Sequence, residues 1–190
     1  MRALEEKIVK EGTVISKDIL KVGCFLNQRI DVDFLVEMGK EIARLYNGEK
    51  ISEILTIEAS GIAIATALAV QLHVPVVFAK KSRASTQNGD VYTATVKSFT
   101  HGNSYTATVS KEFISKGEKV LIVDDFLAHG EALNGLISIV EQAGAEVVGC
   151  AVAIEKNYQG GGDAIRHRGY RVDALAKIAE MDPENGIRFC

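Results

Sequence analysis

Residues 119–132 read KVLIVDDFLAHGEA, and this stretch says more about the fold than any other part of the chain. An unbroken apolar run ends in two adjacent aspartates, Asp124 and Asp125, and Gly130 follows at the start of a helical pattern over 130–143. A short apolar run bounded by turn residues is typical of a strand that is buried on both faces. The stretch therefore predicts a buried strand, then a turn that carries charged side chains, then a helix.

The same alternation of strand and helix continues along the rest of the chain. Short apolar strands are predicted at 53–57, 74–81 and 146–156. Helices are predicted at 2–11, between the cap Asp31 and the stop Gly48, and at 61–72. Apolar strands separated by helices indicate an α/β fold with a parallel core sheet flanked by helices.

Two further segments have the alternating pattern of strands. Residues 91–99 and 104–110 alternate on either side of THGN, which predicts a hairpin. The tail after residue 169 alternates weakly and is a candidate for added strands.

Polar side chains follow each predicted core strand. In a parallel sheet, ligands bind outside the carboxyl ends of the strands. The residues at these ends are 58–61, 80–83, 124–132 and 155–158. The sequence therefore predicts that its polar content collects at one edge of the sheet and forms a binding site there.

The turn that follows the two acids has the features of a phosphate site. It opens a helix, where free backbone N–H groups and the helix dipole favour an anion. Asp124 and Asp125 lie just before it and can accept hydrogen bonds from hydroxyl groups. A ligand whose phosphate binds backbone amides and whose two neighbouring hydroxyl groups bind carboxylates matches a ribose 5-phosphate. The alternative is that the acids only solubilise a strand end. The turn consists of Ala128, His129, Gly130, Glu131 and Ala132.

The run VLIVDD also resembles the first strand of response-regulator receiver domains, where paired acids bind Mg²⁺. In receivers a long stretch of chain must follow that strand. Here only 65 residues follow Asp125, and a strand–helix–strand set precedes it. The receiver interpretation therefore fits poorly.

The stretch VLIVDDFLAHGEA resembles the phosphoribosyl pyrophosphate motif of the type I phosphoribosyltransferases. Over nearly all 190 residues the chain is similar to the bacterial xanthine enzymes of that family. This resemblance implies a single domain over 1–190, with a core at about 32–156 and a small hood from about 1–31 and 157–190. The other stretches that carry the resemblance are LKVGCFLNQRID (20–31), EASGI (58–62), VPVVFAKK (74–81) and IEKNYQ (154–159).

The resemblance also implies an activity, which is transfer of 5-phosphoribosyl from phosphoribosyl pyrophosphate to N9 of xanthine in purine salvage. Mg²⁺ would arrive with the pyrophosphate substrate rather than in a protein cage. A homodimer is expected, with the partner subunit close to the site. Two alternatives remain, a guanine/hypoxanthine enzyme on the same scaffold and a non-catalytic purine-sensing regulator. The regulator would be expected to carry a DNA-binding module, for which this chain has neither the length nor a basic recognition helix.

The leaving pyrophosphate needs cations and amide donors. The turn EASG, with Ser60, supplies amides at a helix start, and Lys80, Lys81 and Arg83 supply positive charge. We expect at least one of these cations, with Lys81 as the candidate, to contact pyrophosphate, although each lysine alone also fits a solvated strand end. Residues 82–90 are expected to be mobile without ligand and to close over the substrates.

Two residues of the phosphate turn depart from the family pattern. Many members place Thr after the alanine and Gly or Thr after the glycine, whereas this chain has His129 and Glu131. Glu131 is expected to face solvent in the first helical turn, where the dipole favours a carboxylate. His129 either donates to the phosphate or contributes only its backbone amide.

Base choice is predicted from Lys156, which lies where the strand 146–156 leaves the sheet. An ammonium group only donates hydrogen bonds, which suits a 6-oxo group and not the amino group of adenine. The resemblance implies that Leu20 and Asn27 cover the base, with Asn27 offering donors to the 2-oxo group. Phe126 either packs in the core or lies against the purine ring.

The composition of the chain argues against several other classes of protein. The chain has 47% hydrophobic residues and can bury one full core, and a net charge of −3 gives no basic field for nucleic acid. Cys24, Cys150 and Cys190 have no paired spacing, which fits a reducing cytoplasm, and no cluster suggests a protein-held metal. The first residues do not read as a signal peptide, and no apolar run reaches the ~20 residues of a membrane helix.

Overall fold

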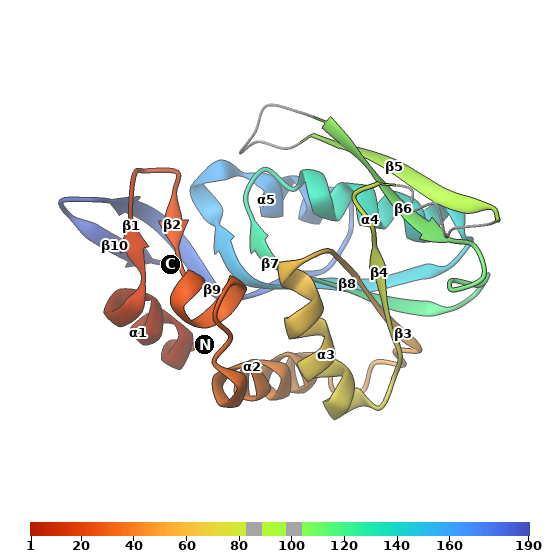
Figure 1. Cartoon of the computed structure of the whole chain (residues 1–190), viewed down its shortest axis with the longest axis horizontal. Helices are drawn as coiled ribbons and strands as arrows, with labels where there is room; N and C mark the ends of the chain where they lie inside the picture. The colour runs from red at the N-terminus through yellow and green to blue at the C-terminus, as the bar shows by residue number, and fades with distance from the viewer. Residues whose placement is uncertain (83–88, 98–103) are drawn as a thin grey trace.

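The computed structural model describes residues 1–82, 89–97 and 104–190, which form three layers (Figure 1). A six-stranded sheet with the order β10-β9-β8-β7-β3-β4 lies in the middle. Helices α2 (Val32–Leu45) and α3 (Ser60–Leu72) cover one face. The other face is covered by α4 (Glu131–Gln142), α5 (Gly161–His167) and a hairpin of β5 (Val91–Lys97) and β6 (Ser104–Ser110).

The central sheet is parallel apart from its last strand. Four parallel pairings join β4 to β3, β3 to β7, β7 to β8 and β8 to β9, and β10 pairs antiparallel with β9. The predicted α/β fold with a parallel core sheet is thus confirmed, and the weakly alternating tail supplies the last two strands. The strands are β3 (Glu53–Ile57), β4 (Val76–Ala79), β7 (Lys119–Leu127), β8 (Glu146–Lys156), β9 (Val172–Asp182) and β10 (Gly186–Phe189).

The strand order creates a crevice between β3 and β7. The chain runs outward from β3 to the edge strand β4 and later returns past β3 to form β7 on its other side. Ligands bind where the order of a parallel sheet reverses in this way, outside the carboxyl ends of the strands. The ends of β3 and β7 carry Glu58 and the Asp124–Asp125 pair.

Strand β7 separates two apolar cores. Val120 and Ile122 pack into the core under α4 and the hairpin, and Leu121 and Val123 pack into the core under α2 and α3. None of these four side chains is exposed to solvent. Because successive side chains of a strand point to opposite faces, an unbroken apolar run was needed here.

The N-terminal segment lies beside β9 and β10 (Figure 1). It contains α1 (Arg2–Glu11), two short paired strands, β1 (Thr13–Val14) and β2 (Leu20–Lys21), and a π-helical turn, η1 (Gly23–Asn27). The N-terminal amine of Met1 donates to the backbone oxygen of Leu175 in β9. The predicted division of the chain into core and hood stays a prediction.

The predicted hairpin is confirmed by seven register pairs, from Val91 with Ser110 to Lys97 with Ser104. Lys80 forms an isolated bridge with Thr108, which joins the hairpin to the end of β4. The connecting residues 98–103, together with Arg83 and most of the predicted closing loop 82–90, lie outside the described residues. Within the described ranges no helix is long and apolar enough to cross a membrane.

Helix α2 is fixed by its cap and by a close approach to α3. The Oδ1 atom of Asp31 accepts a hydrogen bond from the backbone N of Phe34 at 3.2 Å, which confirms Asp31 as the N-cap. Gly39 faces α3, and a Cβ atom there would lie 2.8 Å from the backbone carbon and oxygen of Ala67. The two helices can therefore pack at this distance only because residue 39 has no side chain.

We expect Gly39→Ala to lower the free energy of unfolding by about 1–2 kcal/mol. Overpacking costs about 1–3 kcal/mol, and the better helix propensity of alanine offsets up to about 1 kcal/mol of it. Thermal unfolding followed by circular dichroism measures the change. Lys40→Ala, at the exposed neighbouring position, is the control and should alter stability by no more than about 0.5 kcal/mol. Equal melting of Gly39→Ala and the parent protein would refute the close helix contact.

Candidate functional site

Asp124 is the buried member of the acid pair. Its side chain lies near the end of β7 and is 6% exposed, and its Oδ1 atom accepts a hydrogen bond from the backbone N of Asp125 at 2.9 Å. Burial raises the pKa of Asp124 well above its ordinary value, the charge of Asp125 raises it further, and the ammonium of Lys81 opposes the shift. Asp124 therefore holds its proton more tightly than an exposed aspartate does.

Asp125 is half-buried and connects the core to the N-terminal segment. Its Oδ1 atom accepts from the backbone N of Phe126 at 3.0 Å, and its Oδ2 atom accepts from Nδ2 of Asn27 at 3.3 Å. The structure thus brings the predicted base residue Asn27 to the predicted ribose residue Asp125.

The phosphate turn lines a cavity of about 210 Å³ next to these acids. Gly130 caps α4 with φ of 85°, a left-handed conformation that glycine adopts without strain. The first N–H groups of α4 have no partner inside the helix and open toward this region. Glu131 is half-buried and is among the residues that line the cavity, and the expectation that its carboxylate faces solvent stays a prediction. The turn residues that line the cavity are Ala128, His129, Gly130, Glu131 and Ala132.

The start of α3 lies against the acids. Ser60 is the first residue of α3, and a Cβ atom on Gly61 would lie 3.2 Å from Oδ1 of Asp124 and 2.1 Å from Oγ1 of Thr56. Only a glycine lets the helix begin this close to the carboxylate. The backbone N of Lys81 donates to Oε1 of Glu58 at 2.5 Å. The two predicted pyrophosphate residues, Ser60 and Lys81, therefore lie at the same edge of the sheet as Asp124.

Lys156 and Phe126 lie side by side at the ends of β8 and β7. The Nζ atom of Lys156 is 5.4 Å from the ring centroid of Phe126 and donates to the backbone oxygen of Asp18 at 2.5 Å. Burial lowers the pKa of Lys156, and the negative charge of Asp18 opposes this shift. The arrangement presents an aromatic face and a partly desolvated donor beside Asp125.

Leu20 and Asn27 line a hollow of about 420 Å³ in the N-terminal segment. Leu20 is buried, whereas Asn27 is exposed and reaches Asp125. The structure therefore connects Asn27 directly with Asp125, and Leu20 and Asn27 line the same hollow.

Two polar side chains of the cavity were not predicted from the sequence. Tyr105 and Lys97, from the hairpin, line it together with Lys81, whose Nζ atom lies 5.4 Å from the ring centroid of Tyr105. Burial and the nearby Asp124 raise the pKa of Tyr105. The register pairs Tyr105 with Val96 and Lys97 with Ser104, so Tyr105 and Lys97 point to opposite faces of the hairpin. Alternation in the sequence therefore carries no signal that both residues reach the phosphate turn.

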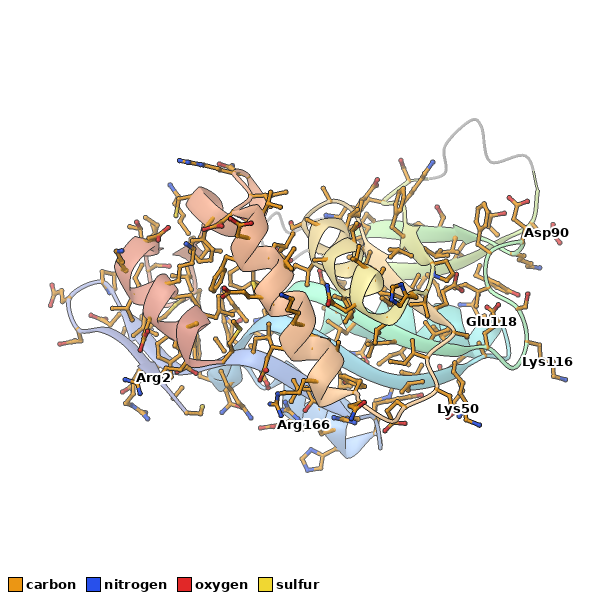
Figure 2. The ribbon with its side chains drawn as sticks, turned by 90° about the horizontal axis from the view of Figure 1, so that it is seen from below. Arg2, Lys50, Asp90, Lys116, Glu118 and Arg166 are labelled. Atoms are coloured by element: carbon orange, nitrogen blue, oxygen red, sulfur yellow. The ribbon has the colours of Figure 1, made fainter. Side chains whose placement is uncertain are left out.

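One buried carboxyl group lies at the amino ends of the strands, away from the site at their carboxyl ends. This differs from the prediction that the polar content collects at the carboxyl ends. Glu53 begins β3 and is 5% exposed, and burial, together with the charge of Glu118, raises its pKa to about 8. Glu118 lies close to Lys50 and Lys116 at one end of the molecule, as Figure 2 shows. This group belongs to the amino ends of the strands and is separate from the site at the carboxyl ends.

Sequence comparison identifies the relatives of this chain. Residues 35–177 match the model of the phosphoribosyl transferase domain. A xanthine phosphoribosyltransferase of Heliobacterium modesticaldum is 54% identical over 96% of this chain and 97% of that protein. Xanthine phosphoribosyltransferase 1 of Clostridium perfringens is 51% identical over the full length of both chains.

Structure comparison agrees on the fold. An adenine phosphoribosyltransferase of Trypanosoma brucei, solved with AMP, pyrophosphate and ribose 5-phosphate, matches with a TM-score of 0.76. The match covers 92% of this chain and 79% of that one at 20% identity, so it bears on the fold alone. Together with the sequence matches, it confirms the resemblance drawn from the phosphate turn. The chain belongs to the type I phosphoribosyltransferase family, among relatives named xanthine phosphoribosyltransferases.

Proposed function

We propose that this chain is a purine-salvage enzyme that transfers the 5-phosphoribosyl group from phosphoribosyl pyrophosphate to N9 of xanthine, giving xanthosine 5′-monophosphate and pyrophosphate. The observation that carries the proposal is the meeting of three groups at one edge of the sheet. These are the Asp124–Asp125 pair, the phosphate turn 128–132 around its cavity, and Lys156 beside Phe126. The names of relatives that are about half identical over the whole chain support the same substrate.

Each part of the sugar donor has a matching partner. The amides of the turn 128–132 hold the 5′-phosphate at the start of α4, and Asp124 and Asp125 accept hydrogen bonds from the ribose hydroxyls. Ser60 and Lys81 hold the pyrophosphate as it leaves. The reaction needs no protein nucleophile, because positive charge that develops on the sugar is stabilised by fixed dipoles and carboxylates around it.

Mg²⁺ fits this site as a companion of the substrate. Among the described residues no group of three His, Cys, Asp or Glu side chains is placed to hold a metal ion. Mg²⁺ is commonly held by one or two carboxylates together with substrate phosphates, and Asp124 and Asp125 supply oxygen donors of this type. When bound with the substrate, Mg²⁺ would neutralise charge on the pyrophosphate.

Hydrogen-bond donors of the protein recognise the oxo groups of the base. Lys156 donates to the 6-oxo group, and the Nδ2 group of Asn27 has two hydrogens, so it can bond Asp125 and the 2-oxo group together. Leu20 and Phe126 enclose the ring. A cytoplasmic setting goes with this assignment and is supported by Cys24, Cys150 and Cys190 being free thiols.

We also propose that the enzyme works as a homodimer. The support is exposed apolar side chains on α3 and on the edge strand β4, where Val70 is 63% exposed and Phe78 is 40% exposed. Large apolar side chains grouped on a surface commonly mark an interface.

Replacement of either acid should lower activity. We expect Asp124→Asn and Asp125→Asn each to reduce kcat/KM for phosphoribosyl pyrophosphate by about 10- to 100-fold, the scale of one hydrogen bond to a charged group. Steady-state kinetics measure the loss, and Asp33→Asn, at an exposed position on α2, is the control. Unchanged kcat and KM in both site variants would reject the ribose assignment.

The same Asp124→Asn variant should melt at a higher temperature than the parent protein. The pKa of Asp124 is raised in the folded state above its ordinary value of 3.8. Protonation of Asp124 therefore contributes fully to the stability of the fold at pH values below 3.8. This contribution is lost as the pH rises through the raised pKa. Asparagine stays neutral at every pH. The gain in melting temperature should therefore increase with pH across this window, and a gain that falls with pH would contradict the assigned shift.

The base-reading residues should affect the oxopurines in different ways. We expect the parent protein to release pyrophosphate with xanthine, and Lys156→Ala to lower kcat/KM for xanthine, hypoxanthine and guanine together by about 10- to 100-fold. Asn27→Ala should lower kcat/KM for xanthine more than for hypoxanthine and so narrow the ratio of the two values. The reason is that xanthine has a 2-oxo group that loses its hydrogen-bond donor in this variant, whereas hypoxanthine has none. Adenine should remain a poor substrate throughout.

Lys10→Ala, at an exposed position on α1, is the control for these variants. An equal loss for all bases in Asn27→Ala would favour the guanine/hypoxanthine enzyme. No pyrophosphate release with any base would favour the non-catalytic regulator.

The dimer is tested by sedimentation at micromolar concentration. We expect a species of twice the 20.5 kDa chain mass, and Val70→Glu should shift it to the monomer because a charge would enter the apolar contact. Val9→Glu, on an equally exposed valine of α1, is the matched control. A parent protein that sediments as a monomer would reject the dimer.

A further inference from the structure

Glu155 and Arg166 form an ion pair that the proposed chemistry does not use, in which the carboxylate is buried and the arginine side chain is 30% exposed. Glu155 lies at the end of β8 and is 1% exposed, and Arg166 on α5 donates to both its carboxylate oxygens, at 2.9 and 2.7 Å. Arg166 (labelled in Figure 2) also donates to the backbone oxygen of Val172 at 3.2 Å. Lys177 adds a second cation, 3.9 Å from Glu155. Two cations thus face the buried carboxylate, and Nη1 of Arg166 also donates to Oδ1 of Asp163 at 3.1 Å.

Such a pair is not required for stability alone. Removing two charges from water is costly, and apolar side chains of similar volume commonly replace a buried ion pair without loss of stability. A bidentate arginine–carboxylate pair does fix the orientation of the two elements it joins, because both hydrogen bonds must be satisfied together. The pair therefore holds α5 at one orientation against the end of β8.

Helix α5 uses its first glycines to touch the phosphate turn. The backbone N of Gly161 donates to the backbone oxygen of Ala128 at 3.1 Å. A Cβ atom on Gly161 would lie 2.3 Å from that oxygen and 2.6 Å from the backbone N of Gly130. These neighbours are backbone atoms of the turn and cannot rotate away. The start of α5 thus forms the rear wall of the turn.

The next glycine connects this wall to the ion pair. A Cβ atom on Gly162 would lie 1.9 Å from Oε1 of Glu155 and 2.7 Å from Nη1 of Arg166. The turn, Gly161, Gly162 and the ion pair are therefore in continuous contact, and Glu155 is also the chain neighbour of Lys156.

We propose that Glu155, Arg166 and Gly161 are positioning residues that hold the backbone of the turn 128–130 in the geometry that binds the 5′-phosphate. This inference rests on the proposed function, which assigns the phosphate to that turn. None of the three touches substrate; they act through Ala128 and Gly130. A purely structural role predicts a loss of stability, whereas a positioning role predicts a loss of affinity for the sugar donor in a protein that still melts normally.

Two variants disturb the contact between the start of α5 and the turn 128–130, one through the ion pair and one through Gly161. Glu155→Met/Arg166→Met replaces the ion pair with apolar side chains, and Gly161→Ala inserts a methyl group into the turn while both charges stay in place. Arg44 and Glu41 on α2 form an exposed bidentate pair, with both distances 2.9 Å. The double variant Glu41→Met/Arg44→Met is therefore the matched control.

We expect both test variants to bind phosphoribosyl pyrophosphate with Mg²⁺ 10- to 100-fold more weakly in titration calorimetry, since small displacements of a binding group have effects on the order of 10²-fold. The KM for xanthine at saturating donor should stay unchanged. Hydrogen exchange of the amides of 127–133 should become faster without ligand, and the melting temperature of the double variant should equal or exceed that of the parent. The control should leave all four quantities unchanged.

Parent-like affinity and exchange in both test variants would overturn the inference. So would a fall in melting temperature with equal losses for both substrates, since that pattern describes general loosening. If the parent protein bound no phosphoribosyl pyrophosphate, the proposed function would fail, and the phosphate part of this inference with it. The exchange rates would still decide whether the ion pair fixes the turn. Should the double variant not fold, Gly161→Ala decides the outcome by itself.

Discussion

The withdrawal of the Asp124 carboxylate from water is the constraint on which the site depends. A strand covered on both faces leads this side chain to a position where burial raises its pKa and the charge of Asp125 adds to the shift. Gly61 leaves room for it because a Cβ atom there would lie 3.2 Å from its oxygen. Lys81 provides a cation and Tyr105 a polar aromatic wall. A buried carboxyl with few fixed partners is costly, and the hydroxyl groups of a bound sugar would supply what the protein leaves out.

The order of the strands explains why the partners of Asp124 come from distant parts of the chain. Because β3, β7 and β8 run parallel, their carboxyl ends meet at one edge. The return of the chain past β3 opens the crevice there, and the hairpin β5–β6 supplies Lys97 and Tyr105 to the cavity beside the turn. Each crossover helix begins at the same edge, so α3 and α4 both direct their free amides toward the site. Helix α5 begins there too but meets the turn from behind.

The sequence was sufficient for the sheet and for the turn, because both depend on local patterns. The run LIV before Asp124 showed a strand buried on both sides, and Gly130 showed where α4 begins. Contacts between distant segments could not be predicted in this way. The hydrogen bond from Asn27 to Asp125 joins residues that are 98 positions apart in the sequence. Only the family resemblance identified Asn27 as a candidate site residue. Tyr105 and Lys97 were missed because alternation does not say over which surface a hairpin folds. Glu53 was missed because a single acid at the start of a strand resembles a solvated end.

The fold by itself does not determine which purine is used, since a protein of nearly the same shape is an adenine phosphoribosyltransferase. The difference must lie in the donors and acceptors at the base. The ammonium of Lys156 is partly desolvated and has three hydrogens, of which the Asp18 oxygen takes one. Its remaining donors need acceptors, and a carbonyl oxygen on the base provides one while an amino group does not. A donor left unpaired in a partly dry site is penalised more than a poor fit of shape. On this physical ground we propose that the lysine at the end of β8, held by a backbone oxygen 138 residues away, favours oxopurines over adenine on a shared scaffold.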